Sequence, residues 1–166
     1  MTENSNTRPV IGVGVLVWRN KQLLLGERLD KKQLNCWQFP GGHLENDESV
    51  IACARREVLE ETGIKVKNLR HLGYTDEQFE VANKNYITLL VSCEYDSGEA
   101  EALEAEKCRR WQWFDYRRLP SPLFVPISRF LVQIRVPSML ANGQDDLYNL
   151  HCASRVLAAV PSGEHR

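Results

Sequence analysis

Three glutamates that lie close together in the sequence have the residue type and spacing that best suit chemistry. Glu57 and Glu61 are four residues apart, and Glu60 is three residues after Glu57, so on a helix the three carboxylates would share one patch of surface. Such a patch is unfavourable without a counter-charge. Clustered oxygens suit a hard divalent cation such as Mg²⁺, which binds a few carboxylates together with water and substrate phosphates. The competing interpretation is a solvated acidic helix face, which the run Arg55–Glu61 taken alone would favour.

A helix from Glu48 to Thr62 is predicted to carry these glutamates. Asn46 or Asp47 is the candidate N-cap, and Gly63 suits the left-handed residue that ends many helices. The apolar side chains at helical spacing are Val50, Ile51, Ala54, Val58 and Leu59. The helix should therefore bury this stripe and present the glutamates on its opposite face.

Strands are predicted on the N-terminal side of this helix. Residues 10–18 and 22–26 are rich in β-branched or aliphatic side chains and are separated by a turn-like segment, which indicates a hairpin. Residues 29–35 are polar and are expected to form a loop. Residues 36–42 look like a short strand that ends in a Pro-Gly-Gly turn, and a glycine pair lets the backbone approach a ligand closely.

The second half of the chain mixes strands and helices. Strand-like segments are found at residues 65–74, 86–95 and 110–114, and apolar residues at helical spacing predict a helix over residues 123–136. Another possible helix covers residues 144–160, and its role cannot be inferred from its pattern. Helices and strands are therefore mixed along the chain, which indicates the α/β class or, more generally, the α+β class.

The length of 166 residues and the hydrophobic content of 43% suit one compact domain. Residues 1–8 are polar and are expected to be a mobile arm, residues 9–136 to form the domain, and residues 137–166 to form a C-terminal extension that includes the possible helix. Since Val10–Trp18 is too short to span a bilayer, no membrane association is expected.

The overall charge argues against binding of a nucleic-acid polymer, and the cysteine spacing argues against a zinc site. Lys and Arg number 21 against 22 Asp and Glu, so no basic field is available to hold a nucleic-acid polymer. The five cysteines are widely spaced, with no CxxC pair or zinc-binding pattern. Reduced thiols in a cytoplasmic protein are expected.

A longer pattern surrounds the three glutamates. The spacing G-x5-E-x7-R-E-U-x-E-E-x-G-U, in which U is an aliphatic residue, is met at every fixed position. The matching residues are Gly42, Glu48, Arg56, Glu57, Val58, Glu60, Glu61, Gly63 and Ile64. The segment from Gly41 to Ile64 therefore resembles the signature of the Nudix (MutT-like) hydrolases, and the predicted strand, turn and helix supply the context that the motif requires.

The resemblance implies an α/β/α sandwich on a mixed sheet, with the signature forming a loop-helix-loop that holds a divalent metal against a diphosphate. It implies that Glu57 and Glu61 bind the metal, that Glu60 assists and that the Gly41 carbonyl completes the shell. Mg²⁺ is the expected ion, and Mn²⁺ would also accept these ligands. Arg56 would orient the acidic cluster. The base that activates water stays open among Glu57, Glu60 and a loop residue such as Glu104 or Glu106.

Segments outside the signature resemble the nucleoside triphosphate diphosphatases related to the cytosolic MutT homologues and 8-oxo-dGTP diphosphatases. These segments are residues 40–45, 104–108, 111–113 and 119–124, and the resemblance extends over about residues 9–130. It implies release of a nucleoside monophosphate and pyrophosphate from dGTP or a modified nucleotide. One departure is Val125, where the relatives often have a tryptophan.

The same resemblance implies four substrate-binding residues. Arg28 would lie near the phosphates and His43 beside the substrate, while Thr88 and Phe124 would form part of the wall of the base pocket. Each has a structural alternative: a surface cation for Arg28, a turn residue for His43, a β-branched strand residue for Thr88 and a core side chain for Phe124. Trp111 and Trp113 would point to the same side of a strand, with at least one of them in the core.

Two other functions remain open. The same chemistry could act on a nucleoside-diphosphate sugar, a dinucleotide or another organic pyrophosphate. The chain could instead be a non-catalytic nucleotide-binding module, since fold does not prove function, although the intact glutamates argue against this. The resemblance also suggests a homodimer.

Overall fold

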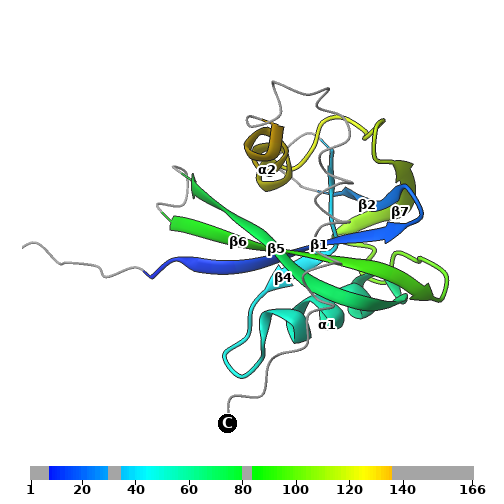
Figure 1. Ribbon diagram of the computed structural model, residues 1–166, viewed down its shortest axis with the longest axis horizontal. Helices are drawn as coiled ribbons and strands as arrows, with labels where there is room; N and C mark the ends of the chain where they lie inside the picture. Colours follow the sequence, from blue (N-terminus) through cyan, green and yellow to red (C-terminus); the bar gives the residue numbers. More distant parts are fainter. Residues whose placement is uncertain (1–7, 30–34, 80–83, 136–166) are drawn as a thin grey trace, which may run out of the picture.

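The computed structural model describes residues 8–29, 35–79 and 84–135, which form a mixed β-sheet between two helices (Figure 1). This is the expected α/β/α arrangement. The expected arm, apart from Arg8, the middle of the loop expected at residues 29–35, and the extension with its possible helix at residues 144–160 lie outside the described residues.

The centre of the sheet is β1 (Val10–Arg19), which pairs with strands on both sides. It forms the predicted hairpin with β2 (Gln22–Arg28), antiparallel, through a tight turn in which Asn20 has a φ of 56°. It also pairs in parallel with β6 (Lys84–Ser97), which pairs antiparallel with β5 (Lys65–Phe79). The main path is therefore β3-β2-β1-β6-β5.

Three shorter strands complete the sheet. β3 (Cys36–Gln38) and β7 (Cys108–Asp115) pair with opposite edges of β2, whereas β4 (Gly41–His43) pairs antiparallel with β1. The prediction that the glycine pair forms a turn was wrong, because both glycines lie in β4. A Cβ at Gly41 would overlap the carbonyl oxygen of Val13, so glycine permits this close pairing.

Helix α1 (Val50–Thr62) carries the signature, and it starts two residues later than predicted. Its N-cap is Ser49, whose Oγ accepts a hydrogen bond of 3.1 Å from the Ala52 N–H, so the prediction of Asn46 or Asp47 was wrong. A serine oxygen at this position pairs one of the free N–H groups of the first turn. The predicted stop is confirmed, since Gly63 has a φ of 76° and donates its N–H to the Leu59 carbonyl oxygen at 2.9 Å.

The buried face of α1 is shifted from the predicted stripe. Cys53, Ala54, Val58 and Thr62 are buried, whereas Leu59 is 47% exposed. The prediction that Leu59 belongs to the buried stripe was therefore wrong, and Thr62 belongs to the buried face instead. The Thr62 hydroxyl donates a hydrogen bond of 2.6 Å to the Val58 carbonyl oxygen, so its burial leaves no unpaired polar atom.

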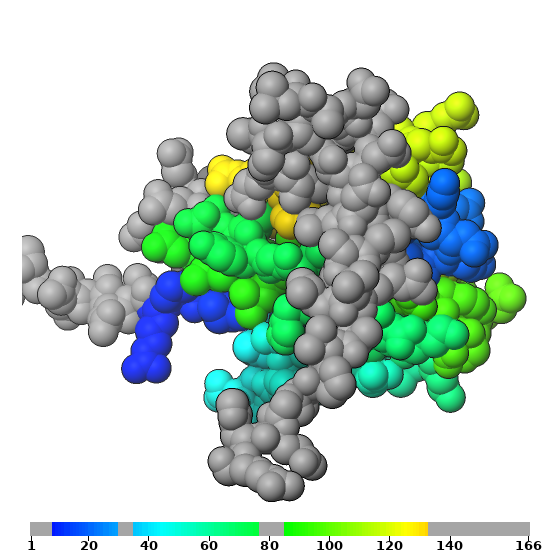
Figure 2. Space-filling model, viewed as in Figure 1, coloured from blue at the N-terminus to red at the C-terminus, as the bar shows by residue number. Residues whose placement is uncertain are grey.

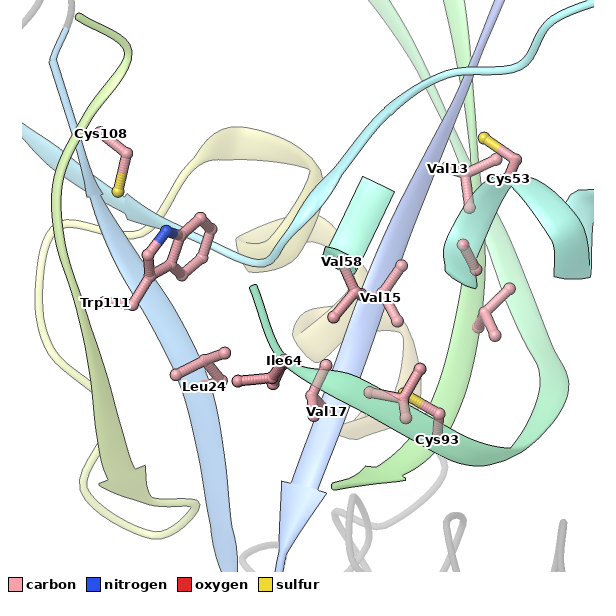
Figure 3. Packing of buried hydrophobic residues seen from close by; sticks show 13 residues of the cluster. Val13, Val15, Val17, Leu24, Cys53, Val58, Ile64, Cys93, Cys108 and Trp111 are labelled. Atoms are coloured by element: carbon pink, nitrogen blue, oxygen red, sulfur yellow. The ribbon is translucent and has the colours of Figure 1, made fainter. Parts of the chain in front are cut away.

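Alternation along β1 divides the core into two layers. Val13, Val15 and Val17 face α1, where they pack with residues such as Val58 and Trp111 (Figure 3). Leu16 and Trp18 face the other side of the sheet, which is covered by α2 (Val125–Arg135). The two layers arise because successive side chains of a strand point to opposite faces of the sheet.

The second predicted helix also starts later than expected. The Phe124 N–H donates to the Trp37 carbonyl oxygen at 2.8 Å, and Leu123 forms a parallel bridge with Trp37. These two residues are therefore engaged by β3 and do not begin α2.

In the space-filling view, β5 and β6 (green) form surface between α2 (yellow) and the segment around β4 (cyan) (Figure 2). Within the described ranges, no helix is long and apolar enough to cross a membrane.

Candidate active site

Arg56 lies at the centre of the acidic residues of the signature. Its Nη2 is 2.6 Å from Glu48 Oε1, and its Nη1 is 2.9 Å from Glu57 Oε1 and 3.2 Å from Glu60 Oε2. The hydrogen bond from Arg56 lowers the pKa of Glu48 to about 2, and the same bond raises the pKa of Arg56. Arg56 thus holds several carboxylates in place by charge-assisted hydrogen bonds.

The carboxylate of Glu57 rests against the backbone of β4. A Cβ at Gly42 would overlap this carboxylate, so the glycine provides the space that Glu57 occupies. The Glu57 side chain is only 13% exposed, and burial raises its pKa although the hydrogen bond from Arg56 lowers it. Glu57 is therefore fixed between α1 and β4 with its negative charge partly uncompensated.

Glu61 is the most strongly perturbed carboxylate of the site. Its Oε2 accepts a hydrogen bond of 3.2 Å from the Gly41 N–H. Burial raises its pKa to about 8, and the charges of Glu57 and Glu104 act in the same direction. Its carbonyl oxygen accepts a bond of 3.2 Å from Trp111 Nε1, which joins this turn of α1 to β7.

Glu57 and Glu61 line a cleft of about 440 Å³, a volume within the range of small-molecule sites. The wall combines these carboxylates and Glu104 with two cations, Arg28 and Lys107. The other lining residues are Leu29, Gln38, Gly41, Gly42, His43, Glu45, Cys108 and Trp111. The cleft therefore offers both acidic groups and cations to one bound molecule.

Glu57 and Glu61 fit a divalent cation by their charge. Their raised pKa values mean that a cation between them would favour the ionised carboxylates. In the part of the chain that the structure describes, no three acidic, histidine or cysteine side chains already form a metal-binding group. The remaining ligands would therefore be backbone oxygen, water and substrate phosphate, as is usual for Mg²⁺. Glu60, 53% exposed, is not among the residues of the cleft wall.

The four proposed substrate-binding residues lie in two places. Arg28 and His43 line the cleft. Arg28 Nη1 donates to Gln38 Oε1 at 2.9 Å, and its guanidinium carbon is 4.6 Å from the centre of the Phe124 ring. Thr88 and Phe124 do not line the cleft; Thr88 is paired with Gly12 in the sheet, and Phe124 packs on the core layer under α2.

Several residues of the cleft were missed by sequence reasoning, among them Gln38 and Lys107. Gln38 faces Arg28 because β3 and β2 pair with Gly26 opposite Gln38, a register that the sequence does not reveal. Lys107 is 3.1 Å from Glu104 Oε1, and this hydrogen bond raises the pKa of Lys107. The sequence signal for Lys107 was its position in residues 104–108, a segment that resembles the nucleoside triphosphate diphosphatases. The prediction that at least one of Trp111 and Trp113 lies in the core is confirmed, since Trp111 is buried, at 9% exposed.

Comparison with known proteins identifies a family and several relatives of the chain. A family model described as the NUDIX domain matches residues 8–133. The chain is 31% identical over 106 residues to an oxidized purine nucleoside triphosphate hydrolase from Danio rerio, a match that covers 64% of this chain and 66% of that protein. It is 32% identical over 120 residues to an NAD-capped RNA hydrolase from Pseudomonas syringae, covering 72% of this chain but only 41% of that protein.

A solved structure supports the same relationship. The MutT Nudix hydrolase from Burkholderia pseudomallei superposes with a TM-score of 0.66 and 27% sequence identity, over 70% of this chain and 91% of that one. The chain therefore belongs to the Nudix hydrolase family, whose enzymes act on pyrophosphate bonds.

Proposed function

We propose that the protein hydrolyses a nucleoside triphosphate, of the dGTP or modified dNTP kind, to a nucleoside monophosphate and pyrophosphate. The observation that carries this proposal is the cleft in which Glu57 and Glu61 lie together with Arg28 and Lys107. Two carboxylates that line one cleft suit a divalent metal bound together with a diphosphate. The two cations suit the remaining phosphate charge. The similarity to an oxidized purine nucleoside triphosphate hydrolase supports this substrate class.

Several residues in and beside the cleft have a proposed task in this reaction. Bound Mg²⁺, or Mn²⁺, would polarise the phosphate oxygens and lower the pKa of the attacking water. The carboxylates of Glu57 and Glu61 would hold that ion, the Gly41 carbonyl and Glu60 would assist, and Arg56 keeps Glu57 in place by its hydrogen bond. The oxygen of water bonds to phosphorus as the bond to the bridging oxygen breaks, and pyrophosphate leaves with that electron pair.

A carboxylate in the cleft takes the proton from the attacking water. Among the candidates from the sequence, Glu57 and Glu104 line the cleft, whereas Glu60 and Glu106 are not part of its wall. We therefore assign the base to one of the first two residues. Glu104 already bonds Lys107, and movement of Lys107 onto a phosphate oxygen would leave Glu104 free to accept the proton.

The base of the nucleotide is proposed to lie on the side of Phe124 and Thr88. Arg28 lines the cleft and stacks on Phe124, so it connects the phosphate site with this aromatic ring. His43 lines the cleft where β4 ends and would lie beside the substrate. The cytoplasmic location and the homodimer suggested by the resemblance stay predictions.

An assay with Mg²⁺ and a panel of canonical and modified nucleoside triphosphates tests the proposal. The unchanged protein should release monophosphate and pyrophosphate, as identified by chromatography. Glu61→Gln should lower kcat/KM by at least about 100-fold, because an ionised ligand and its charge are lost. Glu99→Gln, at an exposed position that is not part of the cleft wall, should keep activity within about twofold. Absence of pyrophosphate from every triphosphate would contradict the proposal.

A second candidate substrate is a dinucleotide or another organic pyrophosphate. It is favoured by the equally high identity to an NAD-capped RNA hydrolase, 32% against 31% for the triphosphate hydrolase. The same panel should include a nucleotide sugar and a dinucleotide. Cleavage of these compounds alone, still abolished by Glu61→Gln, would keep the roles of the α1 glutamates and replace the proposed substrate.

A further inference from the structure

A row of small and hydroxyl-bearing residues crosses three strands on the face of the sheet that α2 covers. Gly12 of β1 pairs with Thr88 of β6, and Thr88 pairs with Thr75 of β5. Residues paired in this way point to the same face of a sheet, with Cβ atoms about 5 Å apart. The row therefore places the Thr88 hydroxyl between a glycine and a second threonine.

The Gly12 end of the row is open. A Cβ at Gly12 would be 3.9 Å from Thr88 Oγ1 and 3.9 Å from the Gly42 carbonyl oxygen, with no closer neighbour. The space above Gly12 is thus bordered by two atoms that can form hydrogen bonds. Gly42 also lines the cleft and touches Glu57, but on the side of the sheet that faces α1, so the backbone of β4 lies between this space and the proposed catalytic groups.

The Thr75 end of the row is closed by α2. The ring of Phe130 is 3.5 Å from the position of a Cβ at Gly73, and Arg129 Nη1 donates to the Asp76 carbonyl oxygen at 3.3 Å. Both contacts lie within two residues of Thr75. As a result, Thr75 is 0% exposed, and only the side of Thr88 leads toward the open space.

The hydroxyl of Thr75 has no hydrogen-bond partner among the described residues. This is unusual, because buried polar atoms in proteins are nearly always paired and an unpaired one destabilises the fold. Thr62, which is also 0% exposed, shows the ordinary arrangement, since its hydroxyl bonds the Val58 carbonyl oxygen and accepts the Ile64 N–H. Thr75 therefore keeps an unused hydrogen-bonding capacity beside Thr88.

We propose that Thr75 is a positioning residue for recognition of the nucleobase. When the polar edge of a base occupies the space above Gly12, the Thr88 hydroxyl bonds the base, and the Thr75 hydroxyl donates to Thr88 Oγ1 and fixes its orientation. The two hydroxyls and the base then form one chain of hydrogen bonds, whose members strengthen one another. This inference rests on the proposed function, which places Thr88 beside the base.

Two substitutions at Thr75 separate this role from a structural one. Thr75→Val keeps the shape and removes the hydroxyl, so KM for the triphosphate should rise about 5–10-fold while kcat stays within about twofold. Its Tm should be unchanged or higher by about 2–4 °C, because an unpaired buried hydroxyl is lost. Thr75→Ser keeps the hydroxyl and loses the methyl group, so its KM should stay close to that of the unchanged protein although its Tm falls.

A double-mutant cycle tests whether Thr75 acts through its neighbour. Thr88→Val should itself raise KM, and adding Thr75→Val to it should raise KM no further, because the hydroxyl to be oriented is already gone. Independent, multiplying effects of the two substitutions would overturn the proposal. So would an unchanged KM for Thr75→Val, or a lowered Tm, which would mean that a buried water already satisfies the hydroxyl.

Turnover by the unchanged protein tests the proposed function separately from the role of Thr75. If that protein hydrolyses no triphosphate, the proposed function fails. The unchanged protein, Thr75→Val and Thr75→Ser are then compared by their Kd for a nucleoside monophosphate, measured by calorimetry. A weaker Kd in Thr75→Val, restored in Thr75→Ser, would support the role of Thr75. Equal Kd values in all three proteins would overturn it.

Discussion

Arg56 contacts four carboxylates, at 2.6 Å for Glu48, 2.9 Å for Glu57, 3.2 Å for Glu60 and 3.9 Å for Glu45. One positive charge cannot neutralise four negative ones, so the site keeps a surplus of negative charge. Beside these carboxylates, burial raises the pKa of Glu57 and Glu61 and so disfavours their ionised forms. A divalent cation would offset the negative charge and favour the ionised carboxylates, which connects the arrangement of individual residues to the proposed metal dependence.

The two glycines of β4 differ in what an added methyl group would meet. At Gly42 it would overlap the end of the Glu57 side chain, and at Gly41 it would overlap the backbone of β1. Gly42→Ala should therefore displace the Glu57 carboxylate and lower kcat/KM by at least about 10-fold, with a small loss of stability. Gly41→Ala should instead lower Tm by roughly 4 °C or more, since the backbone cannot move aside cheaply.

Thermal unfolding and steady-state kinetics of the two alanine variants provide the measurement. Each variant serves as the control for the other, because both add one methyl group to neighbouring residues of the same strand. Full activity in Gly42→Ala would mean that the position of Glu57 is not critical. A normal Tm in Gly41→Ala would mean that β1 and β4 can separate without cost.

At the scale of elements, α1 was predicted well because its information is local. The 3.6-residue period, the glutamate spacing and Gly63 all lie within the helix or next to it. The start was wrong because Asn46, Asp47 and Ser49 are all good N-caps, and only the folded chain shows that Ser49 bonds Ala52. Leu59 was placed in the core because its neighbours in the stripe are apolar, although its own angle around the helix turns it to solvent.

The cap of α1 allows a prediction about this element alone. Ser49→Ala removes the acceptor for the Ala52 N–H, so the free energy of unfolding should fall by about 1 kcal/mol. Chemical denaturation measures this loss. Because Ser49 is not part of the cleft wall, kcat/KM at a temperature well below unfolding should stay within about twofold. Ser49→Asp, which keeps an acceptor, is the matched control and should retain the stability.

At the scale of the whole molecule, the sequence predicted the sheet class, the helical position of the α1 glutamates and two residues of the cleft wall, Arg28 and His43, but not the contacts that Arg28 makes with Gln38 and Phe124. Arg28, Gln38 and Phe124 meet only because β2, β3 and the segment before α2 pair across the sheet. Such pairing depends on registers between segments that are distant in sequence. The same limit explains why Thr75, an ordinary strand threonine in the sequence, gave no sign of its buried, unpaired hydroxyl.

The stability of the whole molecule should depend on pH through Glu61. Its carboxyl has an ordinary pKa of 4.5, which burial raises to about 8 in the fold. Between these values the folded state binds more protons than the unfolded state, so stability is fully present below about pH 4.5 and is lost as the pH rises through about 8. In the presence of EDTA, the Tm of the unchanged protein should therefore fall from pH 5 to pH 8.

Glu61→Gln isolates this contribution, because it removes the titrating group and keeps an acceptor for the Gly41 N–H. Its Tm at pH 8 without metal should exceed that of the unchanged protein by about 4 °C or more, and the difference should vanish near pH 5. Addition of Mg²⁺ at pH 8 should raise the Tm of the unchanged protein more than that of the variant. Parallel pH profiles of the two proteins would contradict the assigned pKa.

The parallel pairing of β1 with β6 also determines when the molecule can fold. β1 begins at Val10, but its parallel partner ends at Ser97, and contacts between such distant segments close slowly because a long loop must be ordered first. On the ribosome, the first hairpin can form early, whereas α1 emerges before β6, the partner that completes the sheet beneath it. Helix α1 therefore packs on a complete sheet only after β6 has been synthesised and has paired with β1.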